Sequence, residues 1–130
     1  MSYEITEQQV IRVLKANSDE RTAYLVEKAV QHGRLWGAKG EQGWLVPITK
    51  DKLEYFPIWP HQDFVQKSVQ DKFDGFEPEE IELDHFLNHW LPLFEKDGVK
   101  VACFPDTDWA FWLIEPKDLV DYFQKEINDE

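Results

Sequence analysis

The sequence predicts an α+β fold for residues 1–130, a single domain with a mostly antiparallel sheet of about five strands and helices packed on it. Three observations support this prediction. Apolar residues recur at helical spacing near both ends of the chain, whereas short apolar runs alternate with turn sequences in the middle. We find no Ser/Gly linker, low-complexity tract or internal repeat that would divide the chain. With 15% aromatic residues, the chain has enough apolar mass to form one core.

Two helices are predicted at the N-terminal end. Thr6 and Gln9 have the spacing of a capping box, and a short apolar face follows over residues 10–14. Ser18 is the expected N-cap of the second helix. Apolar residues of that helix repeat until Gly33, which is expected to end it.

The pattern then changes to that of strands. Residues 35–59 are interpreted as a meander of three short strands separated by the turns "KGEQG" and "TKDK". Pro47 lacks an amide donor, so it is expected at a bulge or with its nitrogen facing away from a neighbouring strand. Pro60 suits the first turn of a helix whose apolar face runs over residues 64–73. "FPIWPHQDF", residues 56–64, is therefore interpreted as a strand-to-helix junction.

The second half of the chain is predicted to contain a helix, a hairpin and a final helix. Asp84 is the expected N-cap of the first, Pro92 must kink or restart it, and Gly98 is expected to close it. "VKVACF" and "WAFWLI" predict a hairpin around "PDTD", and both strands are apolar enough to be central strands covered on both faces. Pro116 is expected in the first turn of an amphipathic C-terminal helix.

The charge is strongly negative and unevenly distributed. Fourteen basic and 26 acidic residues give a net charge of -12, which repels phosphate backbones, so nucleic acid is not expected as a partner. Acidic residues concentrate between Lys72 and Lys96, where there is no Lys or Arg; among them are Glu77, Glu79, Glu80 and Glu82. This stretch is either a solvated surface or a binding surface for a basic protein partner.

The sequence also indicates the cellular compartment of the protein. It has no apolar run of the roughly 20 residues that a membrane helix needs, and its N-terminus lacks the features of a secretory signal. Its one cysteine, Cys103, cannot form an intramolecular disulfide, which agrees with a reducing compartment. We therefore expect a cytoplasmic protein without membrane contact, and leave open whether it is a monomer or a homodimer.

Motifs for catalysis, metals and cofactors are weak or missing. His85 and His89 lie four residues apart, yet no third ligand follows at metal-binding spacing, so no metal site is predicted. Cys103 lies in an apolar run, which favours a buried structural thiol over a nucleophile. The sequence contains no serine-hydrolase elbow, dinucleotide fingerprint or P-loop, so no cofactor is expected and an enzyme is the less favoured class.

Aromatic residues offer the best binding candidates. Trp36, Trp44 and Trp59 lie near expected turns or strand ends, where an indole can present its face and its N–H to a partner. Packing in the core is the alternative for each of them. His61 and Asp63 follow Trp59, so the junction is a candidate binding site, and His61 is expected to be exposed. On that expectation, His61→Ala changes the unfolding free energy by less than about 0.5 kcal/mol.

Several motifs together resemble a known family. They are the W-G and G-W pair in "LWG" and "GWLV", the P-x-W-P segment in "FPIWPHQDF", the acidic stretch before a W-L-P helix, and "DGVKVACFP". In this combination and order, over about residues 20–125, the chain resembles the bacterial family known as domain of unknown function 2750. "FPDTDWAFWLIEP" departs from the pattern of that family. The resemblance implies a bacterial, cytoplasmic, single-domain protein and brings no established activity with it.

Two hypotheses follow from these observations. The first is a non-catalytic protein-interaction module that binds a basic partner, in the manner of toxin-immunity proteins. The second is a small-ligand-binding protein or an enzyme with its site at the junction from Trp59 to Asp63. A pocket that contains His61, Asp63 and exposed Trp rings would favour the second hypothesis.

Overall fold

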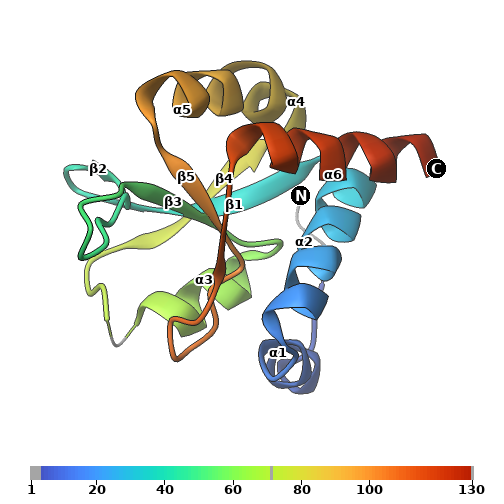
Figure 1. Cartoon of the computed structure of the whole chain (residues 1–130). Coiled ribbons are helices and arrows are strands. Elements are labelled where there is room, and N and C mark those ends of the chain that lie inside the picture. The colour runs from blue at the N-terminus through green and yellow to red at the C-terminus, as the bar shows by residue number, and fades with distance from the viewer. Residues whose placement is uncertain (1–3, 71, 130) are drawn as a thin grey trace.

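The computed structural model describes residues 4–70 and 72–129. In that part of the chain, two three-stranded sheets lie side by side with helices around them (Figure 1). The N-terminal half contains α1 (Glu7–Leu14), α2 (Ser18–His32), β1 (Arg34–Gly40), β2 (Gly43–Trp44), β3 (Tyr55–Ile58) and α3 (Gln62–Val69). The second half contains β4 (Glu77–Glu82), α4 (Leu83–His85), the π-helical segment η1 (Phe86–Trp90), α5 (Leu91–Asp97), β5 (Lys100–Cys103), β6 (Trp112–Ile114) and α6 (Pro116–Asp129).

The α+β class is confirmed, but the expectation of one sheet of about five strands is wrong. The strand orders are β2-β1-β4 in one sheet and β3-β5-β6 in the other. The predicted meander forms only in part: the antiparallel bridge between Ile48 and Glu54 closes the turn "TKDK", but β3 itself pairs with β5 in parallel. Directly after β3, Trp59 forms an isolated antiparallel bridge with Trp36 of β1. Pro47 lies in the loop between β2 and β3, where its carbonyl accepts from Tyr55 N at 3.1 Å. A parallel pair needs a long crossover, and the chain between β3 and β5 supplies it.

Strand β4 was not predicted, because its sequence EPEEIE has a low intrinsic preference for strands. It pairs antiparallel with β1 over six residue pairs. In that register Arg34 is opposite Glu82 and Lys39 is opposite Glu77, while Arg34 Nη1 lies 3.2 Å from Glu80 Oε1. The basic residues of β1 therefore favour the pairing of an otherwise poor strand.

The helix starts are confirmed at α1 and corrected at α2. Thr6 and Gln9 form the predicted capping box. The N-cap of α2 is Asn17 and not Ser18; the Asn17 side chain accepts from Glu20 N at 2.8 Å, and Ser18 is already helical. Asn is at least as good an N-cap as Ser, and its position places the acidic side chain of Glu20 where it completes a second capping box.

The helix stops are as predicted, whereas the start of α4 is not. Gly33 and Gly98 follow α2 and α5 with φ of 71° and 75°, the left-handed conformation that glycine adopts without strain. The cap position before α4 belongs to Glu82, so Asp84 lies in the first turn instead of capping it. Pro92 lies near the start of α5, directly after η1. The predicted kink or restart at this proline is thus a π-helical segment within one uninterrupted run of helical backbone, since Trp90 and Leu91 both have right-handed helical φ and ψ.

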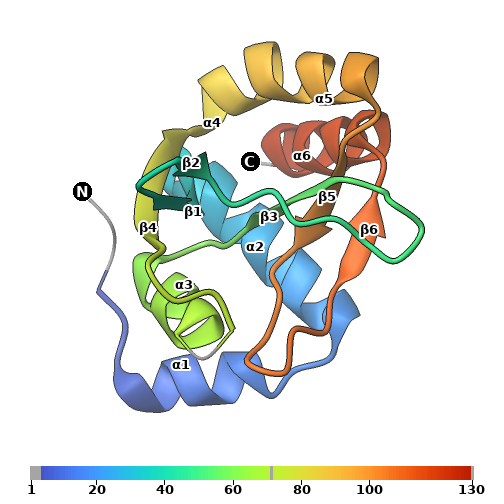
Figure 2. The same ribbon diagram turned by 90° about the vertical axis from the view of Figure 1, so that its left-hand side faces the viewer.

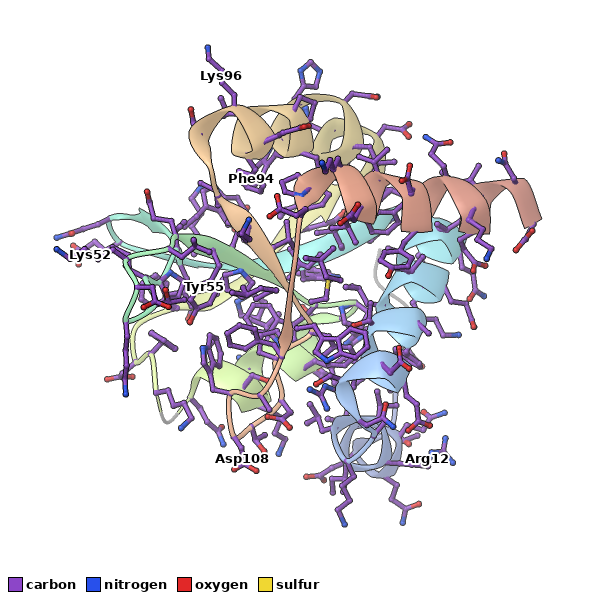
Figure 3. All side chains as sticks on the ribbon, viewed as in Figure 1. Arg12, Lys52, Tyr55, Phe94, Lys96 and Asp108 are labelled. Carbon is purple, nitrogen blue, oxygen red and sulfur yellow. The ribbon has the colours of Figure 1, made fainter. Side chains whose placement is uncertain are left out.

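The W-G and G-W pair has a packing role. A Cβ on Gly37 would lie 3.0 Å from the ring of Trp44 and 3.2 Å from the ring of Phe56. Glycine at position 37 therefore lets the indole of Trp44 lie directly on the backbone of β1. Elsewhere in the structure, apolar and charged side chains are separated in the usual way: Tyr55 and Phe94 point into the molecule, whereas Lys52 and Lys96 point away from it (Figure 3).

The helices pack in two groups. In Figure 2, α5 and α6 lie above the sheets, α1 and α3 lie below them, and α2 crosses behind. Helix α6 contacts both α5 and α2, so the helices above the sheets are joined to the helix behind them. Among the described residues, none of the helices is long and apolar enough to cross a membrane.

Candidate functional site

The predicted junction contains a buried tryptophan. Trp59 is 0% exposed, and its Nε1 donates to the carbonyl of Pro105 at 3.0 Å. Its ring lies 6.0 Å from that of Trp109, measured between centroids. Since both the ring and its N–H are used inside the molecule, Trp59 does not present a face to a partner.

The expectation of an exposed His61 is wrong. His61 is only 3% exposed and is the N-cap of α3, where Nδ1 accepts from the backbone N–H of Asp63 at 3.1 Å. Pro60 precedes the cap and is not in the first helical turn. Asp63 is in that turn, and its carboxylate is 44% exposed. Histidine is an uncommon N-cap, so the sequence did not indicate that this side chain turns back onto its own helix.

Replacing His61 is therefore expected to destabilise the domain. His61→Ala removes the cap and a buried ring that packs edge-on against Phe64, and we expect a loss of about 2 kcal/mol in unfolding free energy. His61→Asn restores a cap acceptor and should recover part of that loss. Urea denaturation of the three proteins measures both effects; a His61→Ala protein within experimental error of wild type would contradict this structural role.

The other two candidate tryptophans also contact the protein itself. Trp36 is 8% exposed, and its backbone N–H and C=O pair with those of Trp59 at 2.8 Å each. Trp44 is half-buried; its ring packs edge-on against Trp90 at 5.0 Å, and the ammonium of Lys39 lies over it at 5.2 Å. The structure thus brings Trp36 and Trp59 together but leaves Trp44 on another part of the core.

The predicted acidic surface is one edge of the first sheet. Glu77, Glu79, Glu80 and Glu82 are all exposed on β4, which is an edge strand. Their charge is partly balanced, because Arg34 and Lys39 on β1 lie across from them. Charged side chains on an edge strand hinder pairing with other chains.

The two histidines of η1 and its flank lie together on the surface. The rings of His85 and His89 are 4.7 Å apart, and both side chains are exposed. Within residues 4–70 and 72–129, no group of three or more His, Cys, Asp or Glu side chains could hold a metal ion.

Cys103 is buried on the central strand β5, and burial raises the pKa of its thiol to about 12. Since the thiolate is the reactive form, we expect iodoacetamide to leave the native protein unmodified at mildly alkaline pH. The same reagent should label Cys103 fully in concentrated urea. Mass spectrometry of both samples measures this, and rapid labelling of the native protein would show that β5 opens readily.

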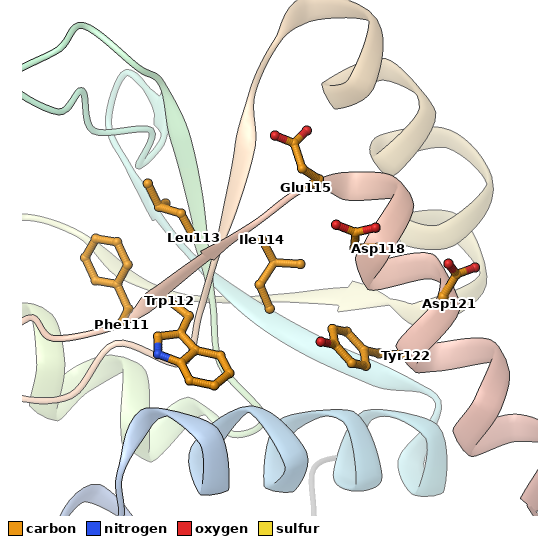
Figure 4. A pocket seen from close by; sticks show the side chains of 8 residues that line it. All are labelled: Phe111, Trp112, Leu113, Ile114, Glu115, Asp118, Asp121 and Tyr122. Atoms are coloured by element: carbon orange, nitrogen blue, oxygen red, sulfur yellow. The ribbon is translucent and has the colours of Figure 1, made fainter.

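A groove beside β6 has the features of a binding site. We name it the β6–α6 groove; it has a volume of about 810 Å³ and is lined by Phe111, Trp112, Leu113, Ile114, Glu115, Asp118, Asp121 and Tyr122. Figure 4 shows Trp112 and Ile114 pointing toward the side of α2, Leu113 pointing to the opposite side, and Tyr122 reaching from α6 toward the strand. Five consecutive lining residues indicate that the strand borders the groove with its open edge.

Large apolar side chains are exposed in this groove. Trp112 is 45% exposed, Tyr122 is 49% exposed and Leu113 is 39% exposed. A second cleft of about 230 Å³ lies between α2 and α6 and shares Trp112 and Tyr122 with the groove. The two hollows therefore form one surface. It exposes a tryptophan and a tyrosine, which are residue types enriched in the hot spots of protein interfaces.

The rim of this surface is acidic. The residues that line the two hollows include six carboxylates and one ammonium group, that of Lys125; the carboxylates are Asp19, Glu115, Asp118, Asp121, Glu126 and Asp129. Glu115 forms an ion pair with Lys100. In the part of the chain that the structure describes, no basic side chain forms an ion pair with Asp118 or Asp121. The groove is thus electrostatically suited to a cationic ligand.

A buried arginine supports the loop that leads into β6. Arg21 on α2 donates from Nε to the carbonyl of Phe104 at 2.9 Å and from Nη2 to the carbonyl of Ala110 at 2.8 Å. Its Nη1 lies 3.7 Å from Asp106 Oδ2. Burial lowers the pKa of Arg21, and the carboxylate of Asp106 opposes that shift. Arg21 thereby connects α2 to both ends of the loop between β5 and β6.

The sequence analysis missed this site. The hairpin of β5 and β6 is confirmed, but only β5 is buried on both faces; Trp112 and Leu113 of β6 are exposed, and β6 is an edge strand of its sheet. The expectation that both strands are covered is wrong because a continuous apolar run does not show which residues other elements cover. A signal was present at Tyr122, which lies off the apolar face formed by Leu119 and Phe123.

Fold and groove together define a small α+β domain with an open, aromatic sheet edge beside an acidic helix. Residues 22–123 of the 130 match the family described as "Protein of unknown function (DUF2750)", and the chain belongs to that family. The resemblance drawn from the tryptophan, glycine and proline motifs is confirmed. The matched residues include β6 and Tyr122. Comparisons with curated proteins and with solved structures gave no match.

Proposed function

We propose that this protein is a non-catalytic interaction module whose β6–α6 groove binds a basic segment of a protein partner. The observation that carries the proposal is that one groove contains exposed Trp112 and Tyr122 together with the carboxylates of Asp118 and Asp121, which form no ion pair with any basic side chain among the described residues. Lysine and arginine side chains match both features, because their stems pack on aromatic rings while their charged ends reach carboxylates. The net charge of -12 adds a long-range attraction for such a partner.

We propose that the acidic strand β4 has a different role from the partner binding that the sequence suggested. Its glutamates lie on a sheet edge and face Arg34 and Lys39 across the ladder. We assign them the role of keeping that edge free of other strands. The main contact with a partner is then at the β6–α6 groove.

The alternative of a ligand site at the junction has less support. Trp59 and His61 are buried, and Asp63 lines a cleft that it shares with Glu7 and Lys67. The expected pocket with an exposed histidine and exposed indole rings is not formed by these residues.

Site-specific photocrosslinking in the cells that make the protein tests the proposal. A benzoylphenylalanine in place of Leu113 should give a discrete adduct with one partner, and the crosslinked peptide should carry more Lys and Arg than Asp and Glu. The matched control has the same reagent at Ile48, which is 62% exposed in the loop between β2 and β3.

Charge neutralisation completes the test. Asp118→Asn combined with Asp121→Asn should weaken the adduct from position 113 strongly, because the ion pairs with the partner are lost. Equal adducts from positions 48 and 113, or an adduct from position 113 that is insensitive to both aspartates, would reject the proposed function.

A further inference from the structure

We infer that the basic segment binds as an extended strand that pairs with the outer edge of β6 and becomes the fourth strand of the sheet β3-β5-β6. This inference rests on the proposed function and specifies how the same groove recognises its partner. In the bound segment, every second side chain is a lysine or arginine, and these side chains face Asp118 and Asp121 on α6.

The backbone of β6 offers the first argument. In the sheet order β3-β5-β6, the described residues place a strand on one side of β6 only. An edge strand turns alternate N–H and C=O groups outward, and these groups can accept an additional strand. The β6–α6 groove is lined by the whole run from Phe111 to Glu115, so its floor includes this edge. An incoming strand of about five residues, roughly 17 Å long, matches that run.

Two of the edge strands, one in each sheet, provide a comparison. The edge at β4 carries four exposed glutamates, which hinder pairing. The edge at β6 instead exposes Trp112 and Leu113 and carries no charged residue between Trp112 and Ile114. One edge is thus protected by charge, whereas the other combines open backbone with large apolar side chains, as strand-accepting edges do.

Side-chain alternation then defines the partner's pattern. Trp112 and Ile114 point to the side where α2 and α6 lie, and Leu113 points to the opposite side (Figure 4). Successive residues of an added strand must also alternate between these two sides. Residues on the α6 side would lie along Trp112 and Tyr122 with their charges near Asp118 and Asp121. Residues on the other side would cover Leu113, so they should be apolar.

A second copy of this chain does not meet these requirements. Pairing two β6 edges would bring two copies of Asp118 and Asp121 to one interface, and each copy carries a net charge of -12. Like charges at close range oppose such an association. The occupant that fits is a heterologous basic segment.

The test uses defined peptides and the full-length protein. The probe is an acetylated, amidated octapeptide of alternating lysine and valine, labelled with fluorescein and titrated by fluorescence anisotropy. One matched control is the same peptide N-methylated at every residue, which keeps all side chains and charges but removes the backbone N–H donor of each residue. A second control replaces each lysine with glutamate.

The parent peptide is expected to bind, and the glutamate peptide is not. N-methylation should weaken binding by about tenfold or more, because two or three interstrand hydrogen bonds are lost. Asp118→Asn with Asp121→Asn should weaken the parent peptide as well. Equal binding of the parent and N-methylated peptides, with both sensitive to the aspartates, would overturn the strand inference and leave the proposed function intact. No binding of either basic peptide would overturn both.

Discussion

Arg21→Met should lower the unfolding free energy by about 3 to 5 kcal/mol, the range measured when one partner of a buried charged network is removed. Arg21 is 2% exposed, although arginine is almost never buried without partners. Its guanidinium donates to the carbonyls of Phe104, Ala110 and Ala16 and to Ser18 Oγ. A methionine fills a similar volume but leaves these acceptors without a donor, and each unsatisfied buried group is costly.

The control for this variant is Arg12→Met. Arg12 is exposed on α1, so the same change in chemistry should alter stability by no more than about 0.5 kcal/mol. Urea denaturation followed by tryptophan fluorescence measures both variants. Similar midpoints for Arg21→Met and Arg12→Met would show that the network around Arg21 does not hold the loop before β6.

The second large effect is expected for Phe104→Ala, at about 3 to 5 kcal/mol, because it leaves a cavity in the core. Phe104 is 0% exposed, and its ring lies 4.7 Å from that of Phe64. Its backbone has a φ of 56°, a conformation that is strained for any residue with a Cβ. The residue is held there because its N–H donates to Ile58 and its carbonyl accepts from Arg21.

A glycine variant separates the cavity from the backbone strain. Phe104→Gly makes a slightly larger cavity than Phe104→Ala, but glycine adopts a positive φ without strain. The glycine protein should therefore be at least as stable as the alanine protein, the reverse of the usual order at a regular position. Differential scanning calorimetry gives this comparison, and a glycine variant clearly less stable than the alanine variant would refute the strain at position 104.

Local patterns in the sequence predicted local structure well. The capping box of Thr6 and Gln9, the stops at Gly33 and Gly98, and the amphipathic helix from Pro116 are all confirmed, because each depends on residues within a few positions of one another. The pairing of strands was predicted less well. Whether β3 continues a meander or joins β5 depends on residues more than forty positions apart, which periodicity does not report.

The candidate site shows the same limit. Trp59 and His61 are residue types that are common in binding sites, but both are buried here. Their burial depends on contacts with Pro105 and with α3 that no local pattern reveals. Trp112 lies in an apolar run that is typical of a core strand, yet it is 45% exposed on the edge strand β6. Burial is thus a property of the assembled elements, and it decides which aromatic residues a partner can reach.

Nuclear Overhauser effects between this protein and the lysine–valine octapeptide test the central claim most directly. A partner strand beside β6 brings its backbone protons close to those of Trp112, Leu113 and Ile114. We predict regularly spaced contacts between the backbone protons of the peptide and those of β6, together with contacts from lysine side chains to the rings of Trp112 and Tyr122. Contacts that fall on β4, or that involve α6 side chains without any backbone proton of β6, would contradict strand pairing at this edge.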